Sequence, residues 1–244
     1  MVFEEFLNQN PFSENMKRIL CIICPVLLLN YPLTGQEYKD ITVKAGTKVI
    51  DYFPVSVRYR YPDFADGRLQ FKNGITRPGL FNYNFLLGEM EFLQSHDTLS
   101  IADKKNISFI TVALDTFFYN NGYIELISEG PVRVGLMHNI RLKTVERKGA
   151  YGTTDRSSSI DTYNSMSFSG NFYKLMPNED WVFQHTLQYY FSAPGRAFIQ
   201  FTRKNVMETF PQKKDAIKEY LKSNRIDFNS RDDLFRFAGY LGKL

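Results

Sequence analysis

Cysteine is almost absent from this sequence of 244 residues. The only two cysteines, Cys21 and Cys24, both lie inside one apolar run, Ile19 to Leu29. The remaining chain therefore has no thiol with which to form a disulfide or a thiolate metal site. A chain of this length without such covalent links has to depend on its own hydrophobic core, and it is long enough to form one large domain.

Long hydrophobic runs are also lacking, since a helix needs about 20 apolar residues to cross a membrane. The run Ile19 to Leu29 is shorter than this, follows the positive pair Lys17 and Arg18, and precedes small residues. This order is typical of a signal peptide. A buried N-terminal helix is the alternative, and Pro25 would interrupt it. We predict a signal peptide over residues 1–35, cleaved before Gln36, with Met16 as an alternative translation start.

Removal of residues 1–35 would also remove the Cys-x-x-Cys pair, which argues against a redox or metal role for it. Neither cysteine directly follows the predicted cleavage site, so a lipid anchor is not expected. The sequence thus predicts an exported protein of the periplasm or the outer membrane surface, with no transmembrane span.

Motifs of common catalytic sites are missing as well. The chain has no Gly-x-x-x-x-Gly-Lys loop, no Gly-x-Gly-x-x-Gly, no Gly-x-Ser-x-Gly and no His-Glu-x-x-His. These absences disfavour nucleotide-dependent enzymes, serine hydrolases of the α/β type and zinc proteases. We expect no cofactor and no metal.

An excess of one charge sign is lacking too, because the formal net charge is only +4. The charges are interspersed, and even the densest basic stretch, residues 141–148, contains Glu146. Nucleic acid is therefore not expected as a partner. Peripheral contact with an anionic membrane surface stays open.

Aromatic residues are abundant, with 22 Phe and 15 Tyr against a single Trp. They occur in short segments separated by turn residues, which is typical of strands. Asn73-Gly74 is a strong hairpin signal. Strands are expected over residues 67–72, 80–87, 90–93, 99–102, 107–114, 123–127, 132–137, 140–145, 171–175, 185–191 and 196–203. Because their connections are short, the strands are predicted to be antiparallel and consecutive, as a β meander.

The segment 149–170 interrupts this pattern with small and polar residues. A loop of that length in a compact domain is usually functional or disordered, and its composition favours disorder. We predict a flexible polar loop inside one β-rich domain that covers residues 36–244.

The C-terminal segment changes to a helical period. Ile217, Tyr220 and Leu221 share one face of a first helix, and a second helix is predicted to begin at Ser230, which forms a capping-box-like pair with Asp233. Leu234, Phe237, Ala238 and Leu241 then follow at helical spacing. The predicted fold is mainly β (α+β): a curved antiparallel sheet, sandwich or half-barrel with two C-terminal amphipathic helices.

Three stretches carry a resemblance: residues 67–74 leading into Phe81-Asn-Tyr-Asn84, residues 88–92, and residues 222–228 with Asp233 and Leu234. Together they are similar to a group of uncharacterised exported proteins of Bacteroidetes-type Gram-negative bacteria. The resemblance extends from about residue 65 to the end. It implies an exported location and a similar fold, and it implies no catalytic residue.

Two residue pairs are candidates for a site. Glu89 and Glu91 are two apart on a predicted strand, so their side chains share a face and can act as paired carboxylates, or else form a solvated strand face. Arg58 and Arg60 alternate with tyrosines on another predicted strand. They are candidates for binding an anionic group or a polysaccharide, with a basic edge strand as the alternative.

Three functions stay open. The first is a non-catalytic binding or accessory module that presents a sheet surface to another envelope protein. The second is a carrier of a lipid or other apolar ligand in an aromatic-lined cavity. The third is a hydrolase of cell-wall or dietary polymers, which requires two carboxylates in one cleft at roughly 5 to 10 Å. An outer-membrane barrel is disfavoured because the chain closes with helices.

Overall fold

The computed structural model describes residues 40–148, 154–157 and 176–244. The described residues all belong to one compact unit. The predicted signal peptide, residues 1–35, lies outside the described residues, and so does the predicted strand 171–175. Of the predicted loop 149–170, only Thr154–Ser157 is described, as strand β10, which pairs with β9.

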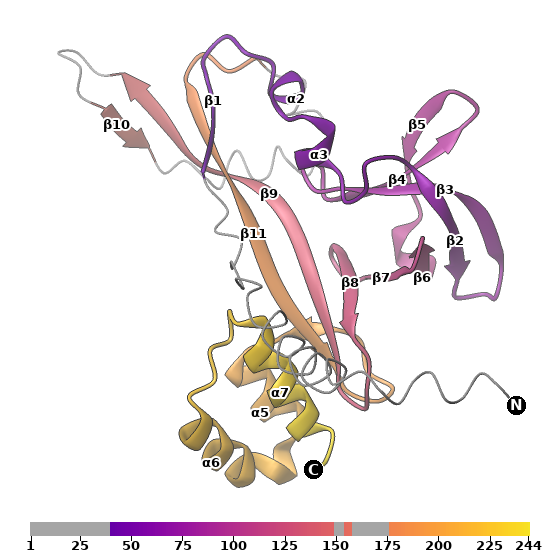
Figure 1. Ribbon diagram of the computed structural model, residues 1–244, viewed down its shortest axis with the longest axis vertical. Coiled ribbons are helices and arrows are strands. Elements are labelled where there is room, and N and C mark those ends of the chain that lie inside the picture. The colour runs from indigo at the N-terminus through magenta and orange to yellow at the C-terminus, as the bar shows by residue number, and fades with distance from the viewer. Residues whose placement is uncertain (1–39, 149–153, 158–175) are drawn as a thin grey trace, which may run out of the picture. The chain divides into compact units, whose positions relative to one another are not determined.

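The described strands form one 12-stranded sheet in which every strand pair is antiparallel (Figure 1). The prediction of a mainly antiparallel β fold is thus confirmed. Besides β10, the strands are β1 (Ile41–Val43), β2 (Ala65–Phe71), β3 (Thr76–Asn84), β4 (Glu89–Gln94), β5 (Asp97–Ser100), β6 (Ile107–Val112), β7 (Asp115–Tyr119), β8 (Tyr123–Ser128), β9 (Arg133–Lys148), β11 (Asp180–Ser192) and β12 (Ile199–Gln200).

Two meanders make up the sheet. The first runs through β2, β3, β4 and β5, and the second through β6, β7, β8, β9 and β11. They are joined where β6 pairs with β2 rather than with β5, so Gly67 to Phe71 lie beside Ile107 to Val112. Two other departures from consecutive pairing lie at the far end of the path, where β11 pairs with β9 and β1 pairs with β11. The two edges of the main path are β1 and β5.

The hairpin between β2 and β3 forms at the predicted Asn73-Gly74 turn. Gly74 has a φ of +87°, a conformation that glycine adopts without strain. The side-chain oxygen of Asn73 accepts a hydrogen bond from the Ile75 amide at 3.0 Å. The turn therefore has the chemistry that fixes the register of the two strands.

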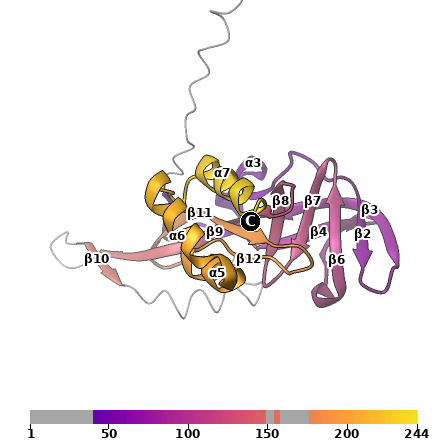
Figure 2. The same ribbon diagram turned by 90° about the horizontal axis from the view of Figure 1, so that it is seen from below.

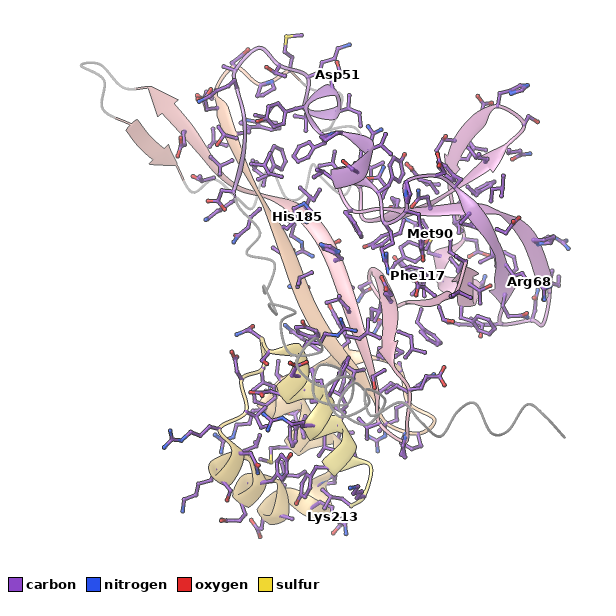
Figure 3. The ribbon with its side chains drawn as sticks, in the orientation of Figure 1. Asp51, Arg68, Met90, Phe117, His185 and Lys213 are labelled. Atoms are coloured by element: carbon purple, nitrogen blue, oxygen red, sulfur yellow. The ribbon has the colours of Figure 1, made fainter. Side chains whose placement is uncertain are left out.

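The sheet curls until the end of β3 meets β9, although four strands separate the two along the sheet. The Ile140 amide donates to the Phe85 carbonyl at 2.9 Å, and the Tyr83 hydroxyl donates to the His138 carbonyl at 3.0 Å. The curl encloses a first core that includes Met90 from β4 and Phe117 from β7, both labelled in Figure 3. The predicted curved sheet is thus present.

A second core lies where three helices pack against β9 and β11 (Figures 1 and 2). The helices are α5 (Arg203–Thr209), α6 (Lys214–Asn224) and α7 (Arg231–Leu241), with a 3-10 turn η4 (Pro211–Lys213) before α6. The two predicted C-terminal helices are confirmed as α6 and α7. The Ser230 side chain accepts from the Asp233 amide, as the predicted cap requires.

Sequence reasoning missed or misplaced several elements. Helix α5 begins inside the predicted strand 196–203, of which only β12 forms. The two strands predicted over 132–137 and 140–145 are one continuous strand, β9. Strands β1 and β7 and the short helices α2 (Val49–Tyr52) and α3 (Val55–Arg58) were not predicted. A 3-10 turn, η1 (Lys104–Asn106), precedes β6.

Candidate functional site

Glu89 and Glu91 do lie on one face of β4, as predicted, on the side opposite Met90 of the core. This face is covered rather than solvated, and Glu91 is only 7% exposed. The segment after α3 contacts this face, because the Tyr59 hydroxyl reaches Glu91, and Tyr59 also forms a bridge with Asn84 of β3. The expectation of a solvated strand face is therefore wrong.

Both carboxylates are engaged by neighbouring side chains. Glu91 accepts a 2.6 Å hydrogen bond from the Tyr59 hydroxyl and a 3.3 Å bond from the Asn84 amide. Glu89 forms an ion pair with Lys104 of η1. Burial raises the pKa of Glu89, and Lys104 opposes that shift. Burial is also the main reason that the pKa of Tyr59 is raised. Its hydrogen bond to Glu91 is the second cause and acts in the same direction. This arrangement ties the segment after α3 and η1 to β4.

The arginine pair does not share a strand face, so that prediction is corrected. Arg58 is the last residue of α3, and only Tyr59 of the following residues forms a bridge. The physical reason is partly local, because Pro54 precedes a single helical turn, and partly long-range, because the Asn82 side chain of β3 holds the next loop. Asn82 accepts from the Tyr61 amide at 3.1 Å and donates to the Tyr61 and Asp63 carbonyls.

Arg60 is committed to acidic partners within the fold. Its guanidinium donates to both carboxylate oxygens of Glu125 on β8, at 2.9 and 3.0 Å, and to Asp115 on β7 at 3.2 Å. The Tyr61 hydroxyl also donates to Asp115, at 2.7 Å. A bidentate contact between an arginine and a carboxylate is among the stronger ion pairs. Arg60 therefore fastens the segment after α3 to the second meander.

Asn82 and Asn84 are buried, and sequence reasoning gave them no such role. The Asn84 oxygen accepts from the Leu86 and Leu87 amides at 3.1 Å, so it shapes the turn after β3. The Phe81-Asn-Tyr-Asn84 motif could have indicated this role of the two asparagines. Two amides alternating with aromatic residues place their polar groups on the face opposite the core.

A histidine pair lies where the curled sheet meets itself. His138 Nε2 is 3.1 Å from His185 Nδ1, and the His138 ring packs on Phe85 with centroids 4.0 Å apart. His185 is labelled partway along β11 in Figure 3. Burial lowers the pKa of His138 to about 4, and His185 and Arg60 add to the effect. Burial also lowers the pKa of His185. The two histidines are 47 residues apart in the sequence, so no local motif indicates the pair.

We expect this pair to make the stability of the protein depend on pH. Unfolded histidine takes up a proton near its ordinary pKa of about 6.5, whereas folded His138 does so only near 4. Stability contributed by the neutral pair is thus complete above about pH 6.5 and falls as the pH drops towards 4. We expect this loss to be roughly 2 kcal/mol, allowing for partial exposure of the ring.

Urea unfolding of the wild-type chain and of His138→Gln at pH 7 and pH 4.5 measures the effect. The variant should lose less stability over this interval, because carboxylates that titrate there are common to both proteins. Equal losses in the two proteins would contradict the prediction.

An open groove of about 710 Å³ lies at the turn of the β2–β3 hairpin and beside η1. It is lined by Phe71, Lys72, Asn73, Ile75, Arg77, Asp103 and Asn106. Lys72 donates to the Lys105 carbonyl, and Asp103 accepts from the Asn106 amide. Arg77 forms no ion pair with any described residue. The groove therefore combines the apolar side chains of Phe71 and Ile75 with two cations and one carboxylate, and Arg77 is the cation without a hydrogen bond or ion pair to a described residue.

Within residues 40–148, 154–157 and 176–244, no group of three or more histidine, aspartate, glutamate or cysteine side chains is arranged to hold a metal ion. The helices of that part of the chain are all too short or too polar to cross a membrane. Comparison of the chain with protein-family models, curated proteins and solved structures finds no match.

Proposed function

We propose that the protein is an exported, non-catalytic binding module of the bacterial cell envelope, which takes an anionic segment of a partner in the groove at the β2–β3 turn. The observation that carries the proposal is the pairing of Arg77 and Lys72 with Phe71 and Ile75 in one open groove. Ligand sites commonly combine apolar walls with a few placed polar groups.

The candidate catalytic groups favour binding over chemistry. Glu91 is held by Tyr59 and Asn84, and Glu89 by Lys104, so neither carboxylate stands in an open cleft with a second one. A hydrolase that uses this pair would have to break these contacts first. The carboxylate-dependent hydrolase is therefore the less supported function.

The aromatic interior gives little support to a lipid carrier. Tyr83 packs against Phe117 and Tyr123 with centroid distances of 5.9 and 5.8 Å, and Tyr119 lies 5.1 Å from Tyr123. Tyr83, Phe117 and Tyr123 are at most 1% exposed. Side chains therefore occupy the space that an apolar ligand would need between these rings.

Export is part of the proposal and rests on the sequence. The apolar run behind Lys17 and Arg18 and the resemblance to exported proteins of Bacteroidetes-type bacteria support it. The protein should be expressed in a Gram-negative host that exports it. Its intact mass, measured by mass spectrometry, should correspond to a chain that begins near Gln36. A full-length chain recovered from the cytosol would contradict this part alone.

The groove is tested with a charge-reversed variant, Lys72→Glu with Arg77→Glu. Affinity isolation from envelope extracts, after cross-linking through a photoreactive residue at Ile75, should give a cross-linked partner with the wild-type chain. The variant should lose at least about 80% of that product, since like charges across an interface cost several kcal/mol.

The matched control removes cations elsewhere, through Lys214→Gln, Lys218→Gln and Lys222→Gln on α6. This variant should keep the cross-link at Ile75. The proposed groove is wrong if the wild type gives no cross-link there, or if both variants give the wild-type product in full.

A further inference from the structure

Helix α6 carries a row of exposed cations. Lys214, Lys218 and Lys222 are four residues apart, and Arg225 follows at the end of the helix. Residues at this spacing lie above one another on a helix. All four side chains are exposed. We call these four residues the α6 stripe.

Most of this charge is uncompensated. Lys218 pairs with Asp215 at 3.1 Å, but Lys214, Lys222 and Arg225 form no ion pair with any described residue. Glu219, the other acidic residue of α6, accepts a hydrogen bond from Ser223. The stripe therefore presents a net positive surface.

The face of α6 beside the stripe is fixed to the second core. Ile217 is fully buried, and Tyr220 stacks on Tyr240 and Phe237 with centroids 3.9 and 5.6 Å apart. Figure 3 labels Lys213, at the start of this helix, on the outside of the helical group. The stripe is thus held on a rigid support with its charges towards solvent.

Arg225 provides a second, independent observation. It is in the left-handed conformation, with φ of +47° and ψ of +51°, at the position after the helix where glycine is the unstrained residue. Its amide still donates to the Leu221 carbonyl at 3.2 Å. A long cation at a strained position that glycine would fill more favourably points to a use for its charge.

We propose that the α6 stripe is a peripheral docking surface for an anionic phospholipid bilayer. Near such a surface, each lysine or arginine adds to the electrostatic attraction. A straight row of exposed cations without an apolar anchor matches the plane of headgroup phosphates and predicts reversible, salt-sensitive binding. The inference adds a second surface to the proposed binding module and uses none of the groove residues.

Flotation with vesicles tests this docking. The full chain should bind vesicles of phosphatidylcholine with about 30% phosphatidylglycerol more strongly than vesicles of phosphatidylcholine alone. The difference should largely vanish between about 0.05 and 0.5 M salt, because screening shortens the range of the attraction. The full chain also carries Lys17 and Arg18 beside the apolar run 19–29, so the contribution of the stripe is the difference between the wild type and a variant that lacks the stripe lysines but keeps that segment.

The stripe variant, Lys214→Gln with Lys218→Gln and Lys222→Gln, should lose about tenfold or more in affinity for the anionic vesicles. The matched variant Arg68→Gln with Lys72→Gln and Arg77→Gln removes the same charge from the β2–β3 hairpin and should bind as the wild type does. It would still fail the groove test above, so the two proposals fail separately.

Arg225→Gly separates charge from folding. It should weaken anionic vesicle binding severalfold while its melting temperature stays the same or rises, because glycine relieves the left-handed strain. The proposal is overturned if the wild type does not prefer the anionic vesicles, if the stripe variant binds undiminished, or if the hairpin variant loses as much binding as the stripe variant.

Discussion

Phe237→Ala is expected to lower the free energy of unfolding by about 3 to 5 kcal/mol, the usual cost of deleting a fully buried phenylalanine ring. Phe237 on α7 is 0% exposed and packs against Phe201, Tyr220 and Phe228, with centroid distances of 5.8, 5.6 and 6.0 Å. These rings come from the segment before α5, from α6 and from the loop before α7. One side chain thus joins α7 to α6 and to the segments that precede α5 and α7.

The loss is large against a total stability of about 5 to 15 kcal/mol for an ordinary domain. Urea unfolding followed by far-ultraviolet circular dichroism should show a clearly lower midpoint. Arg236→Ala is the neighbouring control, because that side chain is 61% exposed and pairs with Asp233 on the surface. Exposed ion pairs add little stability, so its midpoint should stay near the wild-type value.

A different outcome would follow if α7 were a partner-binding tail. Phe237→Ala would then unfold at the wild-type midpoint and lose an envelope partner instead. That result would contradict the packing of Phe237 in the second core.

Local sequence signals predicted the elements whose chemistry is local. The Asn73-Gly74 turn needs only two residues to specify a hairpin, and the cap at Ser230 needs only its amide partner at Asp233. The helical spacing of Leu234, Phe237 and Leu241 indicated a buried face, and all three are buried. These features need no knowledge of the rest of the fold.

Features that depend on distant partners could not be predicted in this way. Glu91 is held by Tyr59, and Arg60 by Glu125, across 32 and 65 residues of sequence. The alternation of arginine and tyrosine between residues 58 and 61 therefore suggested a basic strand face. In the structure three of these residues instead bind acidic side chains of distant strands. The unbroken β9 was misjudged for a similar reason, because pairing with β11 carries the strand through His138 and Asn139.

The curl of the sheet is a further long-range feature. Nothing near Phe85 in the sequence indicates that its carbonyl meets Ile140, and nothing near His138 indicates His185. Strand period and turn residues specify which residues face the core, but they leave open which strands are neighbours. The sequence therefore indicated candidate residues for the site. Their positions relative to one another depend on the pairing of the strands, which the sequence did not indicate.

Gly67→Ala is expected to have the second large effect, at the junction of the two meanders. A β-carbon at position 67 would lie 2.1 Å from the Thr111 carbonyl oxygen on β6 and 2.9 Å from the Phe81 ring. The first contact is with backbone, so β2 and β6 must separate to admit the methyl group. We expect a loss of about 3 kcal/mol or more in unfolding free energy, at the upper end of overpacking costs. Strand propensity alone predicts the opposite sign, because glycine is the poorer strand residue.

Gly239→Ala is the matched control, since no heavy atom lies within 4 Å of its β-carbon and it is part of α7. That substitution should stabilise the protein by roughly 0.5 to 1 kcal/mol. Urea unfolding of both variants decides the matter, and a Gly67→Ala protein as stable as the wild type would show that β2 and β6 do not approach as closely as Thr111 requires.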